Sequence, residues 1–183
     1  TFIELSASTT AGFIVLPSKV ISGFGHKPPS DKLNIAGIGV GGHGYSNLRN
    51  METENIVALC DVDWEYAGSN SFKRWLLAKT YKDYRQMLEQ QKDIDAVVIA
   101  TPDHNHALPA LMAIREKKHV FLQNPLTHSI YESRILKDTA RRFGVATQMG
   151  NQGDSDEGIR RICEWIWAGV IGEVTRVDAW TNR

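Results

Sequence analysis

The stretch from Lys32 to Asp61 constrains the fold of this chain more than any other. A short apolar segment, Leu33–Ile38, leads into three glycines with the spacing Gly-x-Gly-x-x-Gly. These glycines are Gly37, Gly39 and Gly42. A segment long enough for one helix comes next, and a second apolar run, Ile56–Cys60, ends directly before Asp61. The order of strand, glycine-rich turn, helix, strand and acid predicts a βαβ unit with parallel strands.

The three glycines suit a turn that binds a dinucleotide. Gly37 permits the tight turn, and Gly39 lets backbone N–H groups approach a pyrophosphate that a Cβ would hold away. Gly42 would let the following helix pack close to the strand. The N–H groups at the start of that helix, with Val40 and Gly41 in the same turn, are therefore expected to face the phosphates.

Asp61 indicates which dinucleotide is bound. It lies about 20 residues beyond Gly42, where a carboxylate would accept hydrogen bonds from the ribose hydroxyls of adenosine. The same negative charge would repel the 2′-phosphate of NADP. The sequence therefore predicts NAD as the cofactor, in preference to NADP.

Composition and charge argue against several other kinds of ligand. The chain has 183 residues, 42% of them hydrophobic, and its 21 basic and 21 acidic side chains give a formal net charge of zero. No basic run is longer than two residues, so neither a nucleic-acid-binding face nor a patch for anionic membranes is expected. Cys60 and Cys163 lack any metal-ligand spacing and are expected to be core thiols, and no metal site is predicted.

The first thirty residues, Thr1–Ser30, do not resemble part of the same fold. An uncharged, partly apolar run, Leu5–Ser18, precedes a segment rich in Gly, Pro and Ser, Ser22–Ser30. The run is shorter than the ~20 residues that cross a bilayer, and it is typical of an export signal. Thr1–Leu5 is similar to the residues after the arginine pair of twin-arginine signals, although no arginine pair is present. An exported, periplasmic protein is predicted; the alternative is an amphipathic extension that packs on the domain or on a partner, in a cytoplasmic protein.

Beyond Asp61 the chain alternates between strand-like and helix-like segments. The expected strands are Thr80–Tyr81, Ile94–Ala100, His119–Leu122 and Val145–Met149. The expected helices are Tyr84–Gln91, Ala107–Glu116 and Ser129–Phe143, with a broken helix over Trp64–Leu77. This alternation predicts an α/β fold, a Rossmann-type doubly wound parallel sheet, over residues 31–153.

Polar or glycine-rich loops come after the predicted strands, at the edge where ligands of such sheets bind. They are Gly39–Gly42, Asp61, Thr101–His106, Gln123–Pro125 and Gly150–Gly153. Taken singly, His104 and His106 are typical hydrogen-bonding groups at a helix start, and Asn151 is a typical turn residue. Because the loops converge on one edge of the sheet, we expect these side chains to contribute to one cofactor site.

The loops also carry the motifs of a known family. Gly-Ile-Gly-Val-Gly-Gly, Ala-Leu-Cys-Asp, Ala-Thr-Pro-Asp-His-Asn-His, Pro-Leu-Thr and Gln-Met-Gly-Asn-Gln occur in this order. From Lys32 to Arg183 the chain thus resembles the glucose-fructose oxidoreductase and inositol dehydrogenase superfamily, Gfo/Idh/MocA. The resemblance implies that Thr101 and Pro102 line the cofactor and that His106 lies near it. It also implies that Asn151 approaches the nicotinamide.

One position departs from the family pattern. Members carry Glu-Lys-Pro, or in some branches Gln-Lys-Pro, after the fifth strand, and the lysine reaches the nicotinamide ribose and the substrate. In this chain the residues are Gln123, Asn124 and Pro125. Gln123 can still hydrogen-bond a ribose or substrate, but the amide of Asn124 can neither carry a positive charge nor relay a proton. Both residues are expected beside the cofactor, and no residue is assigned as catalytic.

The residues after 153 predict the beginning of a second unit. Glu157–Ala168 has helical spacing, and Glu173–Trp180 is expected to form one strand. The apolar residues on one face of this helix are Ile159, Ile162, Cys163 and Ile166. Family members continue into an α+β domain that carries substrate residues and usually the oligomer contacts. Residues 154–183 are therefore interpreted as leading into a domain that is missing here, in a truncated fragment or a degenerate open reading frame, with a natural one-domain protein as the alternative.

Three functions fit these observations. The first is an exported NAD-dependent oxidoreductase that acts on a sugar or polyol carbon, inactive in this chain alone and homo-oligomeric through the second domain. The second is a nucleotide-binding module without catalysis, in which Asn124 and the missing domain have removed the chemistry. The third, implied by the resemblance, is a glycosidase that uses tightly held NAD for transient oxidation.

Overall fold

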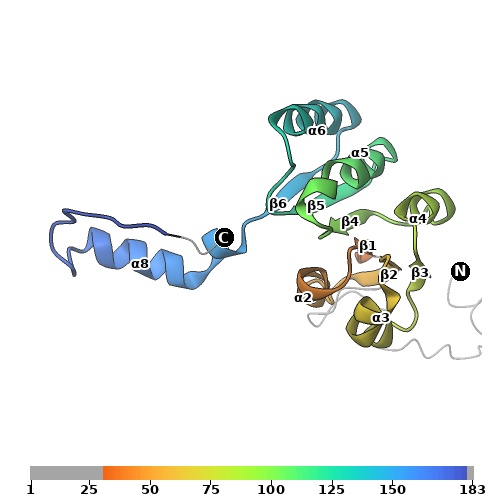
Figure 1. Ribbon diagram of the computed structural model, residues 1–183, viewed down its shortest axis with the longest axis horizontal. Helices are drawn as coiled ribbons and strands as arrows, with labels where there is room; N and C mark the ends of the chain where they lie inside the picture. Colours follow the sequence, from red (N-terminus) through yellow and green to blue (C-terminus); the bar gives the residue numbers. More distant parts are fainter. Residues whose placement is uncertain (1–30, 181–183) are drawn as a thin grey trace, which may run out of the picture.

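The centre of the fold is a six-stranded parallel sheet (Figure 1). The computed structural model describes residues 31–180. Its strands are β1 (Asn34–Ile38), β2 (Asn55–Cys60), β3 (Lys79–Tyr81), β4 (Ala96–Ile99), β5 (His119–Gln123) and β6 (Thr147–Gly150). Their order across the sheet is β3-β2-β1-β4-β5-β6, so the direction of winding reverses between β1 and β4. The predicted Rossmann-type doubly wound sheet is confirmed.

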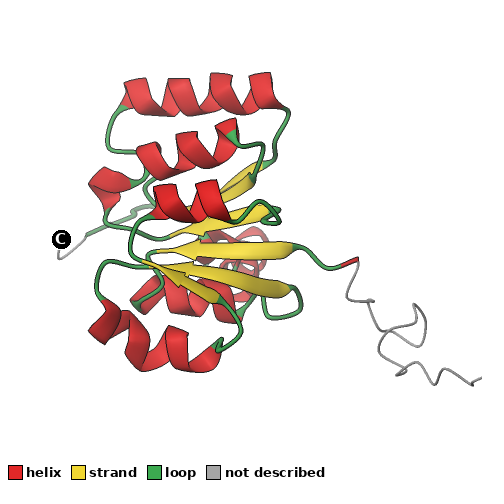
Figure 2. Ribbon diagram, turned by 90° about the vertical axis from the view of Figure 1, so that its right-hand side faces the viewer, coloured by secondary structure: helices red, strands yellow, loops and turns green. Residues whose placement is uncertain are grey.

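Helices cover both faces of this sheet (Figure 2). They are α2 (Gly42–Arg49), α3 (Trp64–Ala67), the π-helix η3 (Gly68–Phe72), α4 (Tyr84–Gln90), the 3₁₀ turn η4 (Asp103–Asn105), α5 (Ala107–Arg115) and α6 (Ile130–Phe143). Leu48 of α2 and Ala67 of α3 join the apolar cluster on one face. Met87 of α4, Ile114 of α5 and Leu136 of α6 join the cluster on the other. The sheet therefore lies between two apolar layers.

Strand β4 shows why the sequence predicts a central strand. Val97 and Ile99 pack into the cluster under α4, α5 and α6, while Val98 packs into the opposite cluster. All three side chains are buried. A strand that is covered on both faces has no polar side to show, so its sequence is an unbroken apolar run.

Helix α6 begins and ends at sequence signals. The Ser129 hydroxyl accepts a hydrogen bond from the Glu132 N–H at 3.3 Å, and the Glu132 carboxylate accepts one from the Ser129 N–H at 3.0 Å. The helix ends at Gly144, whose φ of +67° turns the chain out of the helix. The N–H of Val145 still bonds the carbonyl of Ala140, so β6 begins at Thr147 rather than at the predicted Val145.

The segment after β6 leaves the sheet. It contains α7 (Gln152–Ser155), then α8 (Glu157–Trp167) and residues 168–180, and we call residues 157–180 the arm (Figure 1). The predicted helix is confirmed, and Asp156 caps it by accepting a hydrogen bond from the Gly158 N–H at 2.6 Å. The predicted strand Glu173–Trp180 is wrong, because this segment pairs with no strand among residues 31–180 and adopts no regular structure.

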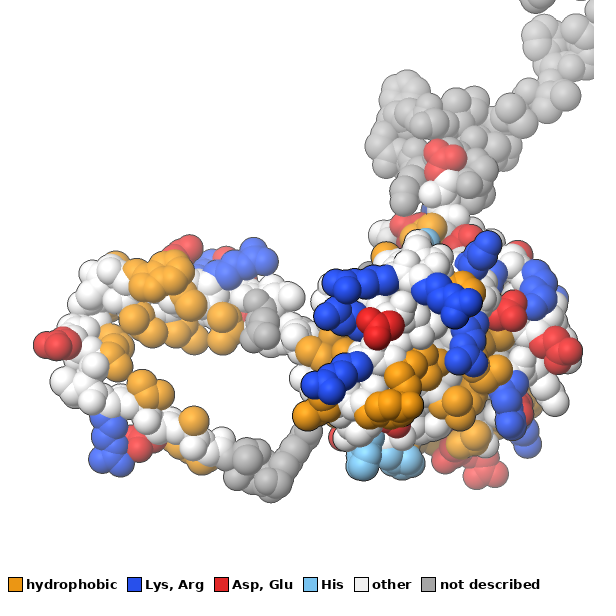
Figure 3. Space-filling model, turned by 90° about the horizontal axis from the view of Figure 1, so that it is seen from above, with side chains coloured by type: hydrophobic (Ala, Val, Ile, Leu, Met, Phe, Trp, Pro, Cys, Tyr) orange, Lys and Arg blue, Asp and Glu red, His pale blue; other side chains and the backbone are white. Residues whose placement is uncertain are grey.

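No side chain of α8 is buried. Figure 3 shows hydrophobic side chains along both limbs of the arm, with a gap between them. Cys163, expected in the core, is only half-buried on α8, whereas Cys60 on β2 is buried as predicted. The core thus ends with the sheet and its covering helices.

The predicted export signal, residues 1–30, lies outside the described residues. Within residues 31–180, no helix combines the length and the apolar character needed to cross a membrane.

Candidate functional site

In the glycine-rich segment between β1 and α2, a Cβ at Gly39 or at Gly44 would collide with backbone atoms. Gly39 has a φ of +74°, and a Cβ there would lie 2.7 Å from the carbonyl oxygen of Ala100. A Cβ on Gly44 would lie 1.8 Å from the carbonyl oxygen of Gly39. Gly44 therefore provides the close approach of helix and turn that the glycine spacing predicts for Gly42, whose φ of +49° serves the turn itself. We call this closely packed turn, which tolerates no Cβ at Gly39 or Gly44, the cradle.

The start of α2 offers backbone N–H groups to a ligand. Its N-cap residue is Gly41, and no side chain caps the helix. The N–H groups of Gly42 and His43 lie in the first turn, where no earlier helical carbonyl can accept from them. Such a helix start favours an anion, and a dinucleotide pyrophosphate fits it.

Asp61 directly follows β2 and organises the turn. Its Oδ2 accepts hydrogen bonds from the N–H of Val40 at 2.8 Å and of Gly41 at 3.3 Å. Its Oδ1 accepts one from the N–H of Asp63 at 3.0 Å. A carboxylate has about four lone-pair sites, so capacity remains for a ribose hydroxyl. The predicted ribose-binding acid therefore also holds the turn that would receive the phosphates.

A cavity of about 440 Å³, which we call the Asp61 cavity, lies beside this turn. Its lining includes Gly39, Gly41, Gly42, Cys60, Asp61, Val62, Tyr66, Lys82, Tyr84, Thr101, Pro102 and Asn105. The ring of Tyr66 lies against Gly41, because a Cβ there would be 2.5 Å from ring atom Cε1. Burial, helped by the charges of Asp61 and Asp83, raises the pKa of the Cys60 thiol to about 12. The thiol therefore stays neutral at this cavity near pH 7.

A second cavity of about 510 Å³, which we call the Asn124 cavity, lies on the other side of the β1–β4 reversal. Its lining is His43, Ala100, Thr101, Asp103, Gln123, Asn124, Pro125, Gly150, Asn151, Gln152 and Gly153. The two cavities share Ala100 and Thr101, so they adjoin at the end of β4. Asn124 Nδ2 donates a hydrogen bond to Asn151 Oδ1 at 3.3 Å. Four residues of the lining, Gln123, Asn124, Asn151 and Gln152, carry neutral amides.

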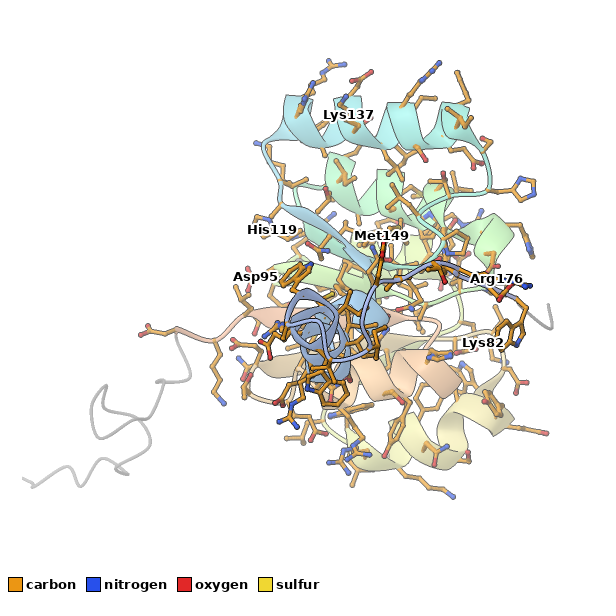
Figure 4. All side chains as sticks on the ribbon, turned by 90° about the vertical axis from the view of Figure 1, so that its left-hand side faces the viewer. Lys82, Asp95, His119, Lys137, Met149 and Arg176 are labelled. Atoms are coloured by element: carbon orange, nitrogen blue, oxygen red, sulfur yellow. The ribbon has the colours of Figure 1, made fainter. Side chains whose placement is uncertain are left out.

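Both cavities lie at the carboxyl ends of the strands. Figure 4 separates the two ends of the sheet: Asp95 and His119, at the amino ends of β4 and β5, lie on one side, and Lys82, which follows β3, lies on the other. Lys82 belongs to the lining of the Asp61 cavity. The structure thus brings the predicted loops to one edge, as expected for a sheet of this topology.

The prediction that His106 lies near the cofactor stays a prediction, and the His106 side chain itself is buried. It is 1% exposed and lines neither cavity. Its Nδ1 lies 2.5 Å from the carbonyl oxygen of Pro125, and its Nε2 lies 2.8 Å from that of Thr101. His106 therefore ties the loop after β4 to the loop after β5. His104 also lies outside both linings.

Several lining residues were not singled out from the sequence, among them His43 in the Asn124 cavity and Tyr66 and Lys82 in the Asp61 cavity. Asp103 and Gln152, which line the Asn124 cavity, lie in the predicted loops Thr101–His106 and Gly150–Gly153. A signal existed for His43, which directly follows Gly42 at the expected phosphate turn. No such signal marked Tyr66, which is placed by the short helix α3. Among the described residues, no group of three or more His, Cys, Asp or Glu side chains could hold a metal ion.

The fold, the cradle and Asp61 together define an α/β domain that binds a dinucleotide. Residues 33–151 match the model of an oxidoreductase family, GFO/IDH/MocA, described as having an NAD-binding Rossmann fold. The chain belongs to this family, as its motifs predict, and contains its NAD-binding domain.

Individual relatives agree with this membership. Inositol 2-dehydrogenase/D-chiro-inositol 3-dehydrogenase of Lacticaseibacillus casei is 31% identical over 144 residues, which are 77% of this chain and 41% of the relative. A glycosyl hydrolase family 109 protein of Shewanella woodyi is 29% identical over 163 residues, 83% of this chain and 35% of the relative. The chain spans about two fifths of the length of these curated relatives.

Solved structures give the same fold. Scyllo-inositol dehydrogenase from Lactobacillus casei, solved with bound NAD(H) and scyllo-inositol, matches with a TM-score of 0.67. The match covers 79% of this chain and 43% of that chain at 23% identity. The similarity at this identity is a similarity of fold.

Proposed function

We propose that this chain forms the NAD-binding part of an oxidoreductase that acts on a hydroxyl-bearing carbon of a sugar or polyol. The observation that carries the proposal is the Asp61 carboxylate at 2.8 Å from the Val40 N–H, beside an uncapped helix start. Relatives named as inositol dehydrogenases support the substrate class. When bound, NAD supplies the acceptor of a hydride.

Each of the two cavities would hold one half of the cofactor. The N–H groups of Val40 and Gly41 donate to Asp61, so the N–H groups of Gly42 and His43 at the start of α2 would hold the pyrophosphate. Asp61 would accept from the adenosine ribose. The Asp61 cavity, walled by Tyr66, suits the adenosine side. The Asn124 cavity then receives the nicotinamide side, where amides can both donate to and accept from ribose and substrate hydroxyls.

We also propose that the 183-residue chain alone does not turn over such a substrate. Asn124 offers only neutral hydrogen bonds, and the loss of one proton-transfer group commonly costs ~10²- to 10⁴-fold in rate. The relatives are more than twice as long as the matched region, and we propose that their further residues position the substrate. Lost positioning can raise the barrier by ~7–11 kcal/mol in favourable cases.

Export to the periplasm and homo-oligomer formation belong to the same proposal. The composition of residues 1–30 supports export, and the family resemblance supports oligomers formed through a second domain. Cell fractionation of the protein expressed with its own N-terminal region tests the first. A protein found only in the cytoplasm would contradict it.

The experiment that tests cofactor binding is calorimetric titration of the folded chain with NAD and with NADP. NAD should bind more tightly, and Asp61→Asn should reduce the ratio of the two affinities, because the amide keeps an acceptor oxygen but loses the charge that repels a 2′-phosphate. Asp138→Asn, an exposed site on α6, is the matched control. Equal affinity of the unaltered chain for both dinucleotides would overturn the assignment of Asp61.

Turnover is tested by following the absorbance of reduced cofactor with a panel of sugars and inositols. We expect no activity from the 183-residue chain and none from Asn124→Lys in this chain. Activity should appear only when Asn124→Lys is combined with the further residues that the relatives carry. Clear turnover by the unaltered chain would overturn the role given to position 124.

Two specific observations favour other candidates. The hydrogen bond between Asn124 and Asn151 occupies the position of the family lysine with a neutral pair, which favours a nucleotide-binding module without catalysis. The glycosyl hydrolase family 109 relative favours a glycosidase that oxidises its substrate transiently. Release of sugar from a glycoside without net accumulation of reduced cofactor would distinguish the glycosidase from the dehydrogenase.

A further inference from the structure

Three amide side chains from separate elements form a closed hydrogen-bonded triangle at the wall of the Asn124 cavity. Asn47 lies in α2, Gln123 ends β5 and Gln152 begins α7, and we call them the amide triad. Asn47 Nδ2 donates to Gln123 Oε1 at 3.0 Å, and Gln152 Nε2 donates to Asn47 Oδ1 at 3.1 Å. Gln152 Nε2 also donates to Gln123 Oε1 at 3.0 Å, and Gln123 Nε2 donates to Gln152 Oε1 at 3.2 Å.

The triad needs groups that donate and accept at the same time. Gln123 accepts two of these bonds and donates a third, which neither a carboxylate nor an ammonium can do. Asn47 is only 7% exposed, so its amide depends on the triad for its hydrogen bonds. The three residues therefore hold one another in a defined geometry although they are far apart in the chain.

Gly150 gives independent support for the importance of this geometry. It pairs with Gln123 across β5 and β6. A Cβ on Gly150 would lie 2.7 Å from Gln123 Oε1 and 3.1 Å from Cζ of Phe121. A side chain at position 150 would therefore displace the Gln123 amide from the place where it meets Gln152.

We propose that the amide triad is a positioning device for the nicotinamide side of the site, an inference that rests on the proposed NAD-dependent function. The triad ties α2, whose first turn faces the phosphates, to the ends of β5 and β6. Gln123 and Gln152 line the Asn124 cavity, next to Asn124 and Asn151, whereas Asn47 does not line it. The triad thus fixes the wall of this cavity relative to the phosphate-binding turn.

The position of Asn47 makes the inference testable. Because Asn47 lies outside the cavity lining, Asn47→Ala removes no wall residue of that cavity, and it can act on cofactor binding through the triad or through the stability of the fold. Gln152→Met is a second variant, at an exposed residue. Each should weaken NAD binding by about fivefold to tenfold, the effect of losing one or two net hydrogen bonds. AMP, which reaches only the Asp61 cavity, should bind within about twofold of its original affinity.

The experiment is calorimetric titration of the 183-residue chain with NAD and with AMP, combined with hydrogen–deuterium exchange without cofactor. The matched control is Gln148→Met, the same change on the exposed surface of β6, outside the triad. The double variant Asn47→Ala/Gln152→Met should be no weaker for NAD than the weaker single variant, since both break one triangle. Exchange should become faster at residues 150–153 and remain unchanged in β2.

Different outcomes would overturn the positioning role of the triad and the proposed NAD-dependent function. Unchanged NAD affinity in both variants would overturn the positioning role, and so would equal losses for AMP and NAD together with a lower melting temperature, which would mean a structural role only. An unaltered chain that binds AMP but not NAD would overturn the proposed function. In that case, faster exchange at residues 150–153 still supports the triad as the support of this wall, and unchanged exchange overturns it.

Discussion

The sheet domain and the arm each contain a helix with apolar residues at helical spacing, but only the helix on the sheet buries them. Helix α6 carries apolar residues at helical spacing and buries Leu136 and Ala140 against the sheet. Helix α8 has the same kind of spacing, yet Ile159, Ile162 and Ile166 all remain more than 40% exposed. Periodicity therefore specifies a helix and the face that it can bury. Whether that face is buried depends on a second surface, which α6 has and α8 lacks among residues 31–180.

The contrast between the two regions should be largest in thiol chemistry, because each region has one cysteine. Cys60 is buried and its pKa is about 12, so at pH 8 on the order of 10⁻⁴ of it is thiolate. Cys163 is partly exposed on α8. Alkylation by iodoacetamide, followed by mass spectrometry of peptides, should modify Cys163 and spare Cys60. Comparable rates in the native chain would mean that β2 opens freely.

The next largest difference is expected for the same substitution in each region. Ile99→Ala should lower the free energy of unfolding by about 2–5 kcal/mol, because Ile99 is fully buried and leaves a cavity. Ile162→Ala should change it by less than about 0.5 kcal/mol. Urea denaturation followed by circular dichroism measures both. A large effect of Ile162→Ala would show that the arm is packed in solution.

Glycine substitutions should give a smaller contrast. Gly44→Ala brings a Cβ to within 1.8 Å of the Gly39 carbonyl oxygen, and overpacking of this kind costs about 1–3 kcal/mol. Gly153→Ala has nothing within 4 Å of its new Cβ and should be neutral. Melting temperatures compare the two variants. NAD titration adds a check, because only Gly44→Ala should displace the turn.

The smallest effect is expected when the arm is removed. A chain that ends at Ser155 should keep its free energy of unfolding within about 0.5 kcal/mol, because α8 contributes no buried residue. It should also be less prone to aggregate, since the arm exposes Trp165, Trp167 and Trp180. Urea denaturation and light scattering test both expectations. A marked loss of stability would contradict the separation of sheet and arm.

The sequence was sufficient where the determinants are local or follow from topology. The turn at Gly39, the acid at Asp61 and the buried strand β4 lie where the spacing predicts, because parallel strands bring their carboxyl ends to one edge. The segment Glu173–Trp180 was predicted wrongly because a strand requires a neighbour, and spacing within one segment says nothing about neighbours.

The details of the site were harder to predict. Both His104 and His106 lie in a loop at the correct edge, but the loop turns His106 inward between two backbone carbonyl groups. His43 lines the cavity instead. The amide triad joins α2 to β5 and α7, and no local pattern connects elements so far apart in the chain. Side-chain direction and long-range pairing are set by packing, which only the folded chain displays.

Asp61 is expected to set the preference for NAD over NADP, and it also holds the glycine-rich turn through two hydrogen bonds. Replacing such an acid by a small neutral residue removes the repulsion of a 2′-phosphate and is the direct route toward NADP. In this chain that change would also free the N–H groups of Val40 and Gly41 from their shared acceptor. A substitution that removes the charge but keeps an acceptor oxygen, Asp61→Asn, should therefore shift the preference with less damage to the turn than Asp61→Ala. Cofactor preference and the shape of the turn are thus coupled through one side chain.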